Sequence, residues 1–342
     1  MAQIRKTIDS LLDNLNPRQK EVIAGRFGLQ NQEPQTLAAI GEKYKLTRER
    51  IRQIENASLG ILKTKITQNP ECQGILQKGK KYLQASGGLV KEDILLSQLN
   101  SVADGLNRNH LNFLIETSGE FFFHGEDKEF WPFYFLNKET MGEAVKFINQ
   151  FSKFLKPKRE LALAGKFDEL FSEFKDSEKT KEAYAKNYLG VSKKVHTNPF
   201  GDTGLAEWPE IKPANIRDRI YLVLKKSNEP LHFETITQKI NETSFNRKVA
   251  LSPTVHNELI KDKRFVLVGR GIYGLAERGY RPGTVQEVIR RILKENGPMK
   301  TKDISLALSR ERIIKPNTIL VNLQNRRFFE RLENGAYRIR ED

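Results

Sequence analysis

The segment from Thr47 to Asn56 is rich in side chains that can hydrogen-bond to the edges of DNA bases. Arginine pairs with guanine through two hydrogen bonds, glutamine does so with adenine, and glutamate accepts from cytosine. In a helix that begins at Thr47, with about 100° between residues, one face would carry Glu49, Arg52, Gln53 and Asn56. Arg48 and Arg50 would fall to its sides, where phosphates lie. The pattern predicts a helix that reads the major groove.

Three predicted helices would position this face. Asn16 and Gln19 have the residue types of a helix N-terminus with a capping box, and Gly28 is typical of the helix end. Thr36 is the expected N-cap of a second helix, and Thr47 that of a third, running to about residue 63. The other side of the third helix is apolar, with Ile51, Ile54, Ile61 and Leu62. The helices form a helix-turn-helix if the polar face meets DNA, or an ordinary three-helix unit if that face is only solvated.

Two strings of this module resemble region 4 of bacterial primary sigma factors. They are Leu15–Gln19 with Arg26–Leu29, and Thr36–Gly41 followed by Leu46–Glu55. The resemblance implies a region that reads the promoter −35 element and docks on the flap of the RNA polymerase β subunit. The candidate DNA contacts of the module are Thr36, Thr47, Arg48, Glu49, Arg50, Arg52, Gln53 and Asn56. Nothing elsewhere resembles the sigma module that opens the −10 element, so we do not expect a complete sigma factor.

Residues 215–342 contain an internal repeat. Asn228–Leu231 is echoed by Asn296–Met299, and Gly271–Tyr273 by Gly335–Tyr337, with a longer first copy around 243–250. Each copy predicts three helices, at 216–226, 233–240 and 253–262, and again at 285–295, 302–309 and 316–325. A hairpin follows, at 265–268 with 272–275, and again at 328–332 with 336–339. Three helices and a hairpin make a winged helix.

This pair resembles the HARE-type helix-turn-helix, a family that includes the N-terminal domain of the RNA polymerase δ subunit and modules of chromatin regulators. The resemblance implies nucleic-acid binding or association with polymerase. The candidate contacts lie on the third helices and wings: His256, Asn257, Lys261, Lys263, Arg264 and Arg270 in the first copy, and Asn317, Asn325, Arg326 and Arg327 in the second. A solvated basic surface or a protein-docking surface is the alternative.

The middle of the chain predicts a further winged helix over residues 75–139. Its helices would be 75–85, 91–99 and 109–117, and its strands 121–123 and 130–136. Pro132 predicts that the last strand lies at a sheet edge, and the acidic hairpin tip would pack on its own domain or bind a protein. Residues 141–175 are expected to be helical with a break at Pro157, followed by a helix at 183–195 and a hairpin over 198–210 that Trp208 would anchor.

Charge supports nucleic-acid contact at both ends of the chain. The net charge is +15, with +5 in residues 1–70, −1 in 71–215 and +11 in 216–342. Cys72 is the only cysteine, which excludes an internal disulfide, and the histidines show no metal-ligand spacing. Gly269–Gly274 fits a dinucleotide-binding motif, but no helix follows it to receive a pyrophosphate, so it is interpreted as a wing turn. We expect no enzyme activity, cofactor, metal or small-molecule substrate.

The sequence therefore predicts a mainly α protein, with an N-terminal helix-turn-helix domain of three to four helices and several winged-helix modules with small β-hairpin wings. The predicted modules are 1–70, 71–140, 141–214, 215–278 and 279–342. The predicted function is a cytoplasmic DNA-binding transcription regulator that acts on double-stranded DNA, with RNA polymerase core as a partner and no membrane association. The alternative is an accessory protein of RNA polymerase, similar to the δ subunit, whose C-terminal modules bind protein or displace nucleic acid.

Overall fold

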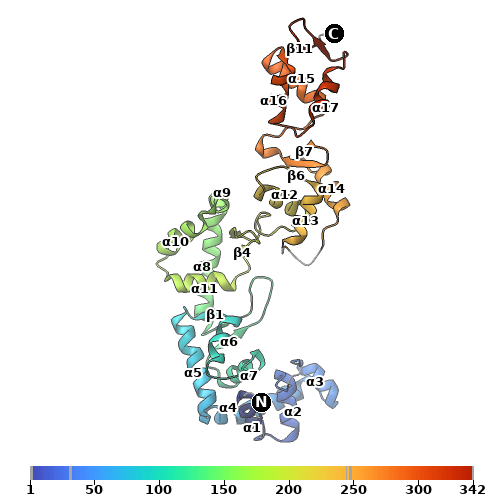
Figure 1. The fold of residues 1–342 in the computed structure, drawn as a ribbon. Coiled ribbons are helices and arrows are strands. Elements are labelled where there is room, and N and C mark those ends of the chain that lie inside the picture. Colours follow the sequence, from blue (N-terminus) through green and yellow to red (C-terminus); the bar gives the residue numbers. More distant parts are fainter. Residues whose placement is uncertain (1–2, 31–32, 244, 246–248, 341–342) are drawn as a thin grey trace. The chain divides into compact units, whose positions relative to one another are not determined.

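A computed structural model describes residues 3–30, 33–243, 245 and 249–340 of the chain (Figure 1). The chain divides into two compact units. The first comprises residues 1–196 and 203–206, and the second 197–202 and 207–342. Both are mainly helical with small antiparallel sheets, as predicted. The finer division into five modules stays a prediction. Within the described residues, no helix combines the length and the apolar character that crossing a membrane requires.

Four helices begin the first unit. They are α1 (Gln3–Leu12), α2 (Pro17–Phe27), α3 (Leu37–Tyr44) and α4 (Arg48–Gln68). The predicted caps are confirmed. Asn16 and Gln19 form the capping box of α2, Gly28 ends it in the left-handed conformation, and Thr36 and Thr47 cap α3 and α4. Helix α1 was not predicted, although its apolar residues Ile4, Ile8, Leu11 and Leu12 recur at helical spacing and are buried.

A winged helix follows, in the order helix, strand, helix, helix, strand, strand. Its elements are α5 (Pro70–Ala85), β1 (Leu89–Lys91), α6 (Glu92–Asn100), α7 (Arg108–Ser118), β2 (Phe122–His124) and β3 (Phe133–Phe135). The strand order is β1-β3-β2, so β3 is the central strand. The prediction that Pro132 makes β3 an edge strand is therefore wrong. Pro132 lies just before the strand, where its missing N–H costs no ladder hydrogen bond, and its carbonyl accepts from the N–H of Glu92.

One hydrophobic core joins this winged helix to the helices before it. Side chains of α1, α2 and α4, among them Ile8, Phe27 and Leu62, belong to the same buried cluster as Leu76, Leu99 and Phe113. A smaller cluster of Val22, Ile40 and Ile51 holds the helix-turn-helix itself. In Figure 1, α7 lies beside α2 and α4. Residues 3–135 therefore fold around a shared core that continues across residue 70.

The first unit ends in a helical segment. It comprises α8 (Lys138–Leu155), a short 3₁₀ turn (Lys156–Lys158), α9 (Arg159–Leu161), a π turn (Ala162–Lys166), α10 (Phe167–Ser177) and α11 (Glu182–Val191). The break at Pro157 is confirmed, and Phe151 packs against Phe171 and Phe174 across it. The acidic tip of the first wing packs on this segment, where Lys193 binds Glu126 at 2.6 Å. The hairpin lies earlier than predicted, with strands β4 (Val195–Thr197) and β5 (Thr203–Leu205), and Trp208 is buried.

The second unit consists mainly of two winged helices with the same element order. The first contains α12 (Ile216–Lys226), β6 (Leu231–His232), α13 (Phe233–Glu242), α14 (Ser252–Lys261), β7 (Phe265–Gly269) and β8 (Ile272–Leu275), followed by a 3₁₀ turn (Ala276–Arg278). The second contains α15 (Val285–Asn296), β9 (Met299–Lys300), α16 (Thr301–Ser309), α17 (Pro316–Leu323), β10 (Phe329–Arg331) and β11 (Ala336–Ile339).

Both predicted hairpins are confirmed, and each sheet gains a third strand that was not predicted. Strands β6 and β9 follow Pro230 and Pro298 and pair with the last strand of their wing, which gives the orders β6-β8-β7 and β10-β11-β9. Gly271 has a φ of +68° in the turn between β7 and β8, so the glycine motif forms a wing turn as predicted. The longer loop expected around 243–250 includes residues 244 and 246–248, which lie outside the described residues.

Candidate nucleic-acid interface

Helix α4 exposes all the polar side chains that were predicted to read DNA. Thr47 begins the helix, and its hydroxyl accepts a hydrogen bond from the N–H of Arg50 at 3.1 Å. The exposed polar residues of the first three turns are Arg48, Glu49, Arg50, Arg52, Gln53 and Asn56. We call this surface the reading face. Thr36 is exposed as well and caps α3 through the N–H of Ala39.

Two side-chain pairs organise the reading face. Arg52 donates to both carboxylate oxygens of Glu49, at 2.9 and 2.7 Å, and Arg50 donates to the amide oxygen of Gln53 at 3.0 Å. The hydrogen bonds from Arg52 lower the pKa of Glu49, and the same carboxylate raises the pKa of Arg52. Both partners are more than half exposed, and exposed pairs of this kind are weak. The guanidinium of Arg52 is therefore held along the helix, yet it can exchange Glu49 for another acceptor.

The opposite side of α4 is anchored by polar as well as apolar contacts. Ile51 and Leu62 are fully buried, whereas Ile61, predicted on the apolar side, is 42% exposed. Glu55 takes the buried position instead and binds Arg26 of α2 at 3.0 Å. At about 100° per residue, the predicted apolar side extended from Ile51 toward Ile61. The buried stripe extends from Ile51 in the other direction around the helix, toward Glu55. A partner for Glu55 29 residues away cannot be inferred from the helix pattern.

The turn between α3 and α4 requires a glycine. A Cβ at Gly41 would lie 2.7 Å from the carbonyl oxygen of Leu46, closer than the two atoms can approach. The N–H of Leu46 donates to the Gly41 carbonyl at 2.9 Å. The close approach of these two residues sets the angle between the helices, and with it the direction in which α4 presents its reading face.

Helix α7 of the first winged helix supports α4 from behind. Phe113 stands edge-on to Phe27 of α2, with ring centroids 5.5 Å apart, and Asn109 donates to the Gly28 carbonyl at 3.1 Å. Glu116 is exposed at its tip but lies near Arg26 and Glu55, and partial desolvation there raises the pKa of its carboxyl group. In a winged helix the third helix is the one that usually enters the groove. Here most of that helix is buried, in a core shared with the N-terminal helices, so it supports α4 and leaves little free surface of its own.

The candidates in the second winged helix are divided between exposed and engaged residues. Lys261, Lys263 and Arg270 are exposed, at the end of α14 and at the wing turn. Arg264 instead binds Asp262 at 2.7 Å and lies over the ring of Tyr221. This ion pair raises the pKa of Arg264 and lowers that of Asp262. Arg264 therefore joins α14 to the wing and α12.

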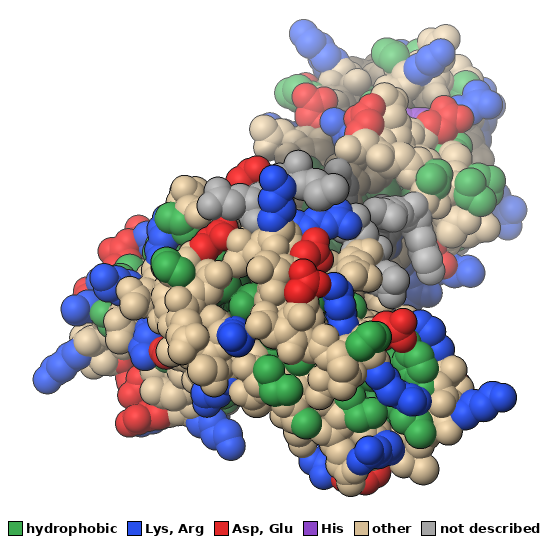
Figure 2. All heavy atoms as spheres, turned by 90° about the horizontal axis from the view of Figure 1, so that it is seen from below, with side chains coloured by type: hydrophobic (Ala, Val, Ile, Leu, Met, Phe, Trp, Pro, Cys, Tyr) green, Lys and Arg blue, Asp and Glu red, His purple; other side chains and the backbone are tan. Residues whose placement is uncertain are grey.

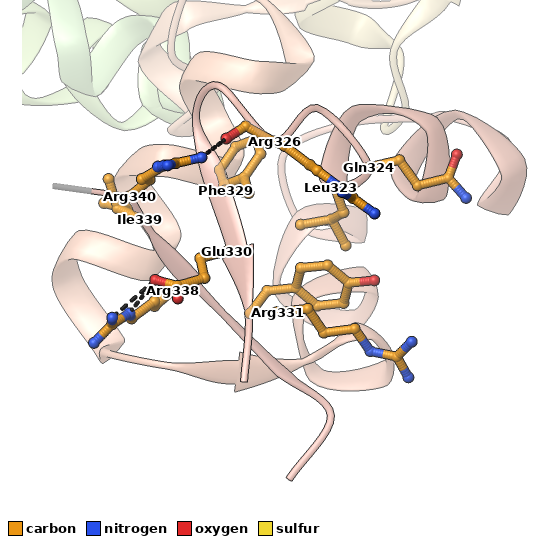
Figure 3. Close-up of a pocket in the computed structure, with 10 residues that line it drawn as sticks. Leu323, Gln324, Arg326, Phe329, Glu330, Arg331, Arg338, Ile339 and Arg340 are labelled. Atoms are coloured by element: carbon orange, nitrogen blue, oxygen red, sulfur yellow. Dashed lines mark hydrogen bonds and ion pairs between the residues drawn. The ribbon is translucent and has the colours of Figure 1, made fainter. Parts of the chain in front are cut away.

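The third winged helix places its cations around the wing. Asn325, Arg326 and Arg327 are exposed in the turn before β10, as expected of contact residues. Three further arginines, Arg331, Arg338 and Arg340, were not predicted, although Arg338 lies in β11 and Arg340 directly follows that strand. With Arg326 they line an open groove of about 1010 Å³. Figure 3 shows Gln324 and Arg326 on one side of the wing, and Arg338 and Arg340 on the other.

The described part of the chain offers no arrangement for metal chemistry. No three His, Cys, Asp or Glu side chains among the described residues lie close enough to hold a metal ion. Cys72 is buried, and its burial raises the pKa of the thiol to about 12, so the reactive thiolate is disfavoured.

Lysine and arginine side chains are distributed over the face shown in Figure 2, with acidic side chains between them. Charge alone thus does not single out a candidate surface on this face.

The comparisons with known proteins concern the segment that contains α4. Residues 11–64 match the family described as Sigma-70, region 4. The RNA polymerase sigma factor SigA of Microcystis aeruginosa is 42% identical over 81 residues, 24% of this chain and 18% of that protein. RpoD of Helicobacter pylori is 45% identical over 62 residues, 18% and 9% of the two chains, and sigB of Arabidopsis thaliana is 42% identical over 66 residues, 19% and 12%. The chain thus spans less than a fifth of the length of these relatives.

Proposed function

We propose that this protein is a DNA-binding transcription regulator whose helix α4 reads a promoter element of the −35 type, in cooperation with RNA polymerase. The observation that carries the proposal is the match of residues 11–64 to sigma region 4, in a segment whose candidate contact residues are all exposed, six of them on helix α4. Double-stranded DNA and RNA polymerase core are the partners that follow, and the cytoplasm is the compartment.

In the proposed contact, hydrogen bonds between side chains of α4 are replaced by hydrogen bonds to the edges of DNA bases. In the free protein, Arg52 and Glu49 satisfy each other, as do Arg50 and Gln53. In the major groove, Arg52 would turn to guanine, Gln53 to adenine and Glu49 to cytosine. Arg48 and Arg50 would meet phosphates, which position the helix without reading sequence. Each pair is exposed and therefore weak. Breaking it on binding costs little free energy compared with the desolvated contacts that replace it.

The two C-terminal winged helices, which we propose are HARE-type modules, would add nucleic-acid contacts outside the promoter element. The second function predicted from the sequence, an accessory subunit of RNA polymerase, has no support from the relatives described above, which are sigma factors. The short overlap with those relatives leaves the two C-terminal winged helices unmatched, so their role in the proposed regulator is inferred from their charge and fold alone.

Selection of bound sites from random duplex DNA with the full chain tests the proposal. A conserved site should emerge, and Arg52→Ala should lower affinity for it by roughly 1–3 kcal/mol while leaving affinity for unrelated duplexes nearly unchanged. Lys65→Ala is the matched control, because Lys65 is exposed on the same helix about 20 Å further along its axis. An equal loss on all duplexes would mean that Arg52 touches only phosphate, and no enriched site would overturn the proposal.

Cooperation with polymerase is tested separately. The full chain should be retained by purified RNA polymerase core, and retention should survive Arg52→Ala, since the reading face is expected to contact DNA and not the enzyme. Absence of retention would remove polymerase from the proposal and leave a DNA-binding protein.

A further inference from the structure

We propose that the third winged helix holds a nucleic-acid backbone along the exposed edge of its wing, in a site independent of helix α4. The groove described above is lined by four arginines, Arg326, Arg331, Arg338 and Arg340, and by a single carboxylate, that of Glu330. The other lining residues include Gln324 and Tyr337, which add a hydrogen-bonding amide and an aromatic ring. Arginine is the side chain best suited to phosphate oxygens.

The arginines are arranged for a chain of phosphates rather than for one small anion. Strand β10 is an edge strand of its sheet. The register pairs Arg331 with Tyr337 and Glu330 with Arg338, so Arg331 and Arg338 stand on opposite faces of the wing. Figure 3 likewise shows labelled cations on both sides of it. A single phosphate cannot reach both faces, whereas a polymer laid along the edge would meet each in turn.

The third helix of this module is poorly suited to reading DNA bases itself. Helix α17 (Pro316–Leu323) contains no Lys or Arg. Its outer surface presents Leu320 and Val321, which are 41% and 66% exposed. Its exposed polar side chains are Asn317 and Thr318, which can donate hydrogen bonds but bring no positive charge to phosphates. The cations of the module lie on the wing and on the turn before it, so binding there would follow the backbone and not the sequence.

The equivalent edge of the second winged helix shows what a wing without this site looks like. Strands β7 and β8 contain no charged residue. The Val268 carbonyl of β7 accepts a hydrogen bond of 2.7 Å from the N–H of Ile313, and a Cβ at Gly269 would lie 2.7 Å from the Ile313 carbonyl oxygen. That edge is therefore covered by the next module. Strand β10 has arginines around it instead.

Tyr337 adds a surface for a base. Its ring is half-buried, and the guanidinium of Arg331 lies 6.0 Å from the ring centroid. An aromatic ring beside cations is the combination by which proteins hold single-stranded nucleic acid without sequence preference. The phosphate chain is common to single strands and duplexes, so both belong among the probes.

The test measures binding of the full chain to three probes of one mixed sequence: single-stranded DNA, the same strand as RNA, and the DNA duplex. The groove variant is Arg326→Ala with Arg331→Ala and Arg338→Ala. The matched control is Lys294→Ala with Lys302→Ala and Arg310→Ala, which removes the same charge from exposed positions of the same winged helix outside the groove. A reading-face variant, Arg48→Ala with Arg52→Ala, separates this site from the proposed promoter contact.

The groove variant should bind at least one probe on the order of tenfold more weakly than the control. The slope of log affinity against log salt should become shallower by about 2 on a single strand, or by nearly 3 on a duplex. The probe with the largest loss identifies the strand form. The reading-face variant should keep its single-strand affinity, because a single strand has no major groove. Replacing the same three arginines by lysine should restore most of the binding.

Three results would overturn the proposal. The first is a loss no larger than that of the control on every probe. The second is polyglutamate competing as well as the nucleic acid, which would make the groove a general site for polyanions. The third is normal binding accompanied by self-association of the groove variant, which would assign the arginines to protecting an open strand edge from pairing with another copy. Each of these results leaves the proposed role of α4 untouched.

Discussion

Two segments of this chain fold alike and differ in what their third helix does. Residues 70–135 and 285–339 both run helix, strand, helix, helix, strand, strand, with the last strand in the centre of the sheet. In the first segment, α7 is buried against the N-terminal helices through Phe113 and Leu114. In the second, α17 packs through Ile319 and Leu323 into the core of its own module, and Leu320 and Val321 are exposed. The same topology therefore serves once as a support and once as a free module.

Because α7 and α17 occupy the same place in the two winged helices but differ in burial, the winged-helix topology does not by itself identify a DNA contact. The outer surface of α7 is used to support α4 from behind, and the candidate contact residues are on α4. In the third winged helix the third helix has no Lys or Arg, and arginines lie on the wing and on the turn before it. Helix α4 is capped by Thr47, whereas α17 begins at Lys315 without a side-chain cap. A helix that must present side chains accurately is thus fixed at its end as well as along its back.

The largest loss of stability should come from a substitution in α7, the helix that supports α4. Phe113→Ala should destabilise the first unit by about 3–5 kcal/mol, because it removes a fully buried aromatic from the core shared with α1, α2 and α4. Sequence-specific duplex binding should fall with it, although Phe113 lies far along the chain from the reading face. Urea unfolding and binding to the selected site, measured on the same samples, check both parts.

The matched control for this change is Phe329→Ala. Phe329 is 2% exposed in the core of the third winged helix, so the change should cost a similar free energy of unfolding there. It should leave the preference for the selected site over unrelated duplexes intact, because the third winged helix is proposed to hold the backbone without reading sequence. If Phe113→Ala keeps full affinity in conditions where the first unit remains cooperative, α7 does not position α4.

The next effect concerns the ion pair that fixes α4 on α2. Arg26→Met should cost about 1–3 kcal/mol, because it leaves the nearly buried carboxylate of Glu55 without its partner. Changing Glu55 to Leu in the same chain should recover most of that loss, since the two apolar side chains can then pack against each other. Thermal unfolding of the three proteins checks this pattern. A double variant no more stable than Arg26→Met would mean that the pair contributes packing rather than charge compensation.

The sequence predicted the elements of the molecule better than it predicted their association. Caps such as Asn16 and Thr47, and turns such as that at Gly271, act within a few residues, so their signals are local and the helices and hairpins they delimit were found. The burial of Glu55 and of α7 depends on partners 29 or more residues away, as the contact of Asn109 with Gly28 also does. No periodicity reports such pairings. Strands β6 and β9 were missed because two residues are too few to show alternation.

The candidate site divides in the same way. The reading face of α4 could be predicted because one amphipathic helix carries it. The arginines around β10 were only partly found, because Arg326 and Arg327 form a visible basic run, whereas Arg331 and Arg340 line the same groove only when the hairpin closes. Arg264 was predicted as a DNA contact because it is an arginine just before the wing. Its ion pair with Asp262, two residues away, instead lets it join α14 to the wing.

The smallest effect tests how closely α7 and α4 are packed, through Glu116. Its partial desolvation raises its pKa above the ordinary value of 4.5, so the folded state holds the proton more tightly than the unfolded state. The corresponding stability is fully present below about pH 4.5 and is lost as the pH rises through the raised pKa. Glu116→Gln keeps the hydrogen-bonding shape without the charge. It should therefore be more stable than the natural protein near neutral pH, and the two should converge in acid.

Unfolding midpoints of the first unit, measured across this pH range, check the prediction. Glu160→Gln is the control, because Glu160 is also exposed but belongs to α9, not to α7, and that change should not alter the dependence on pH. A Glu116→Gln variant that is less stable at neutral pH would show that the ionised carboxylate binds Arg26 strongly enough to outweigh its desolvation. In that case Arg26 would hold α4 and α7 together at once, and Arg26→Met should uncouple the two helices more severely than the loss of its bond to Glu55 alone.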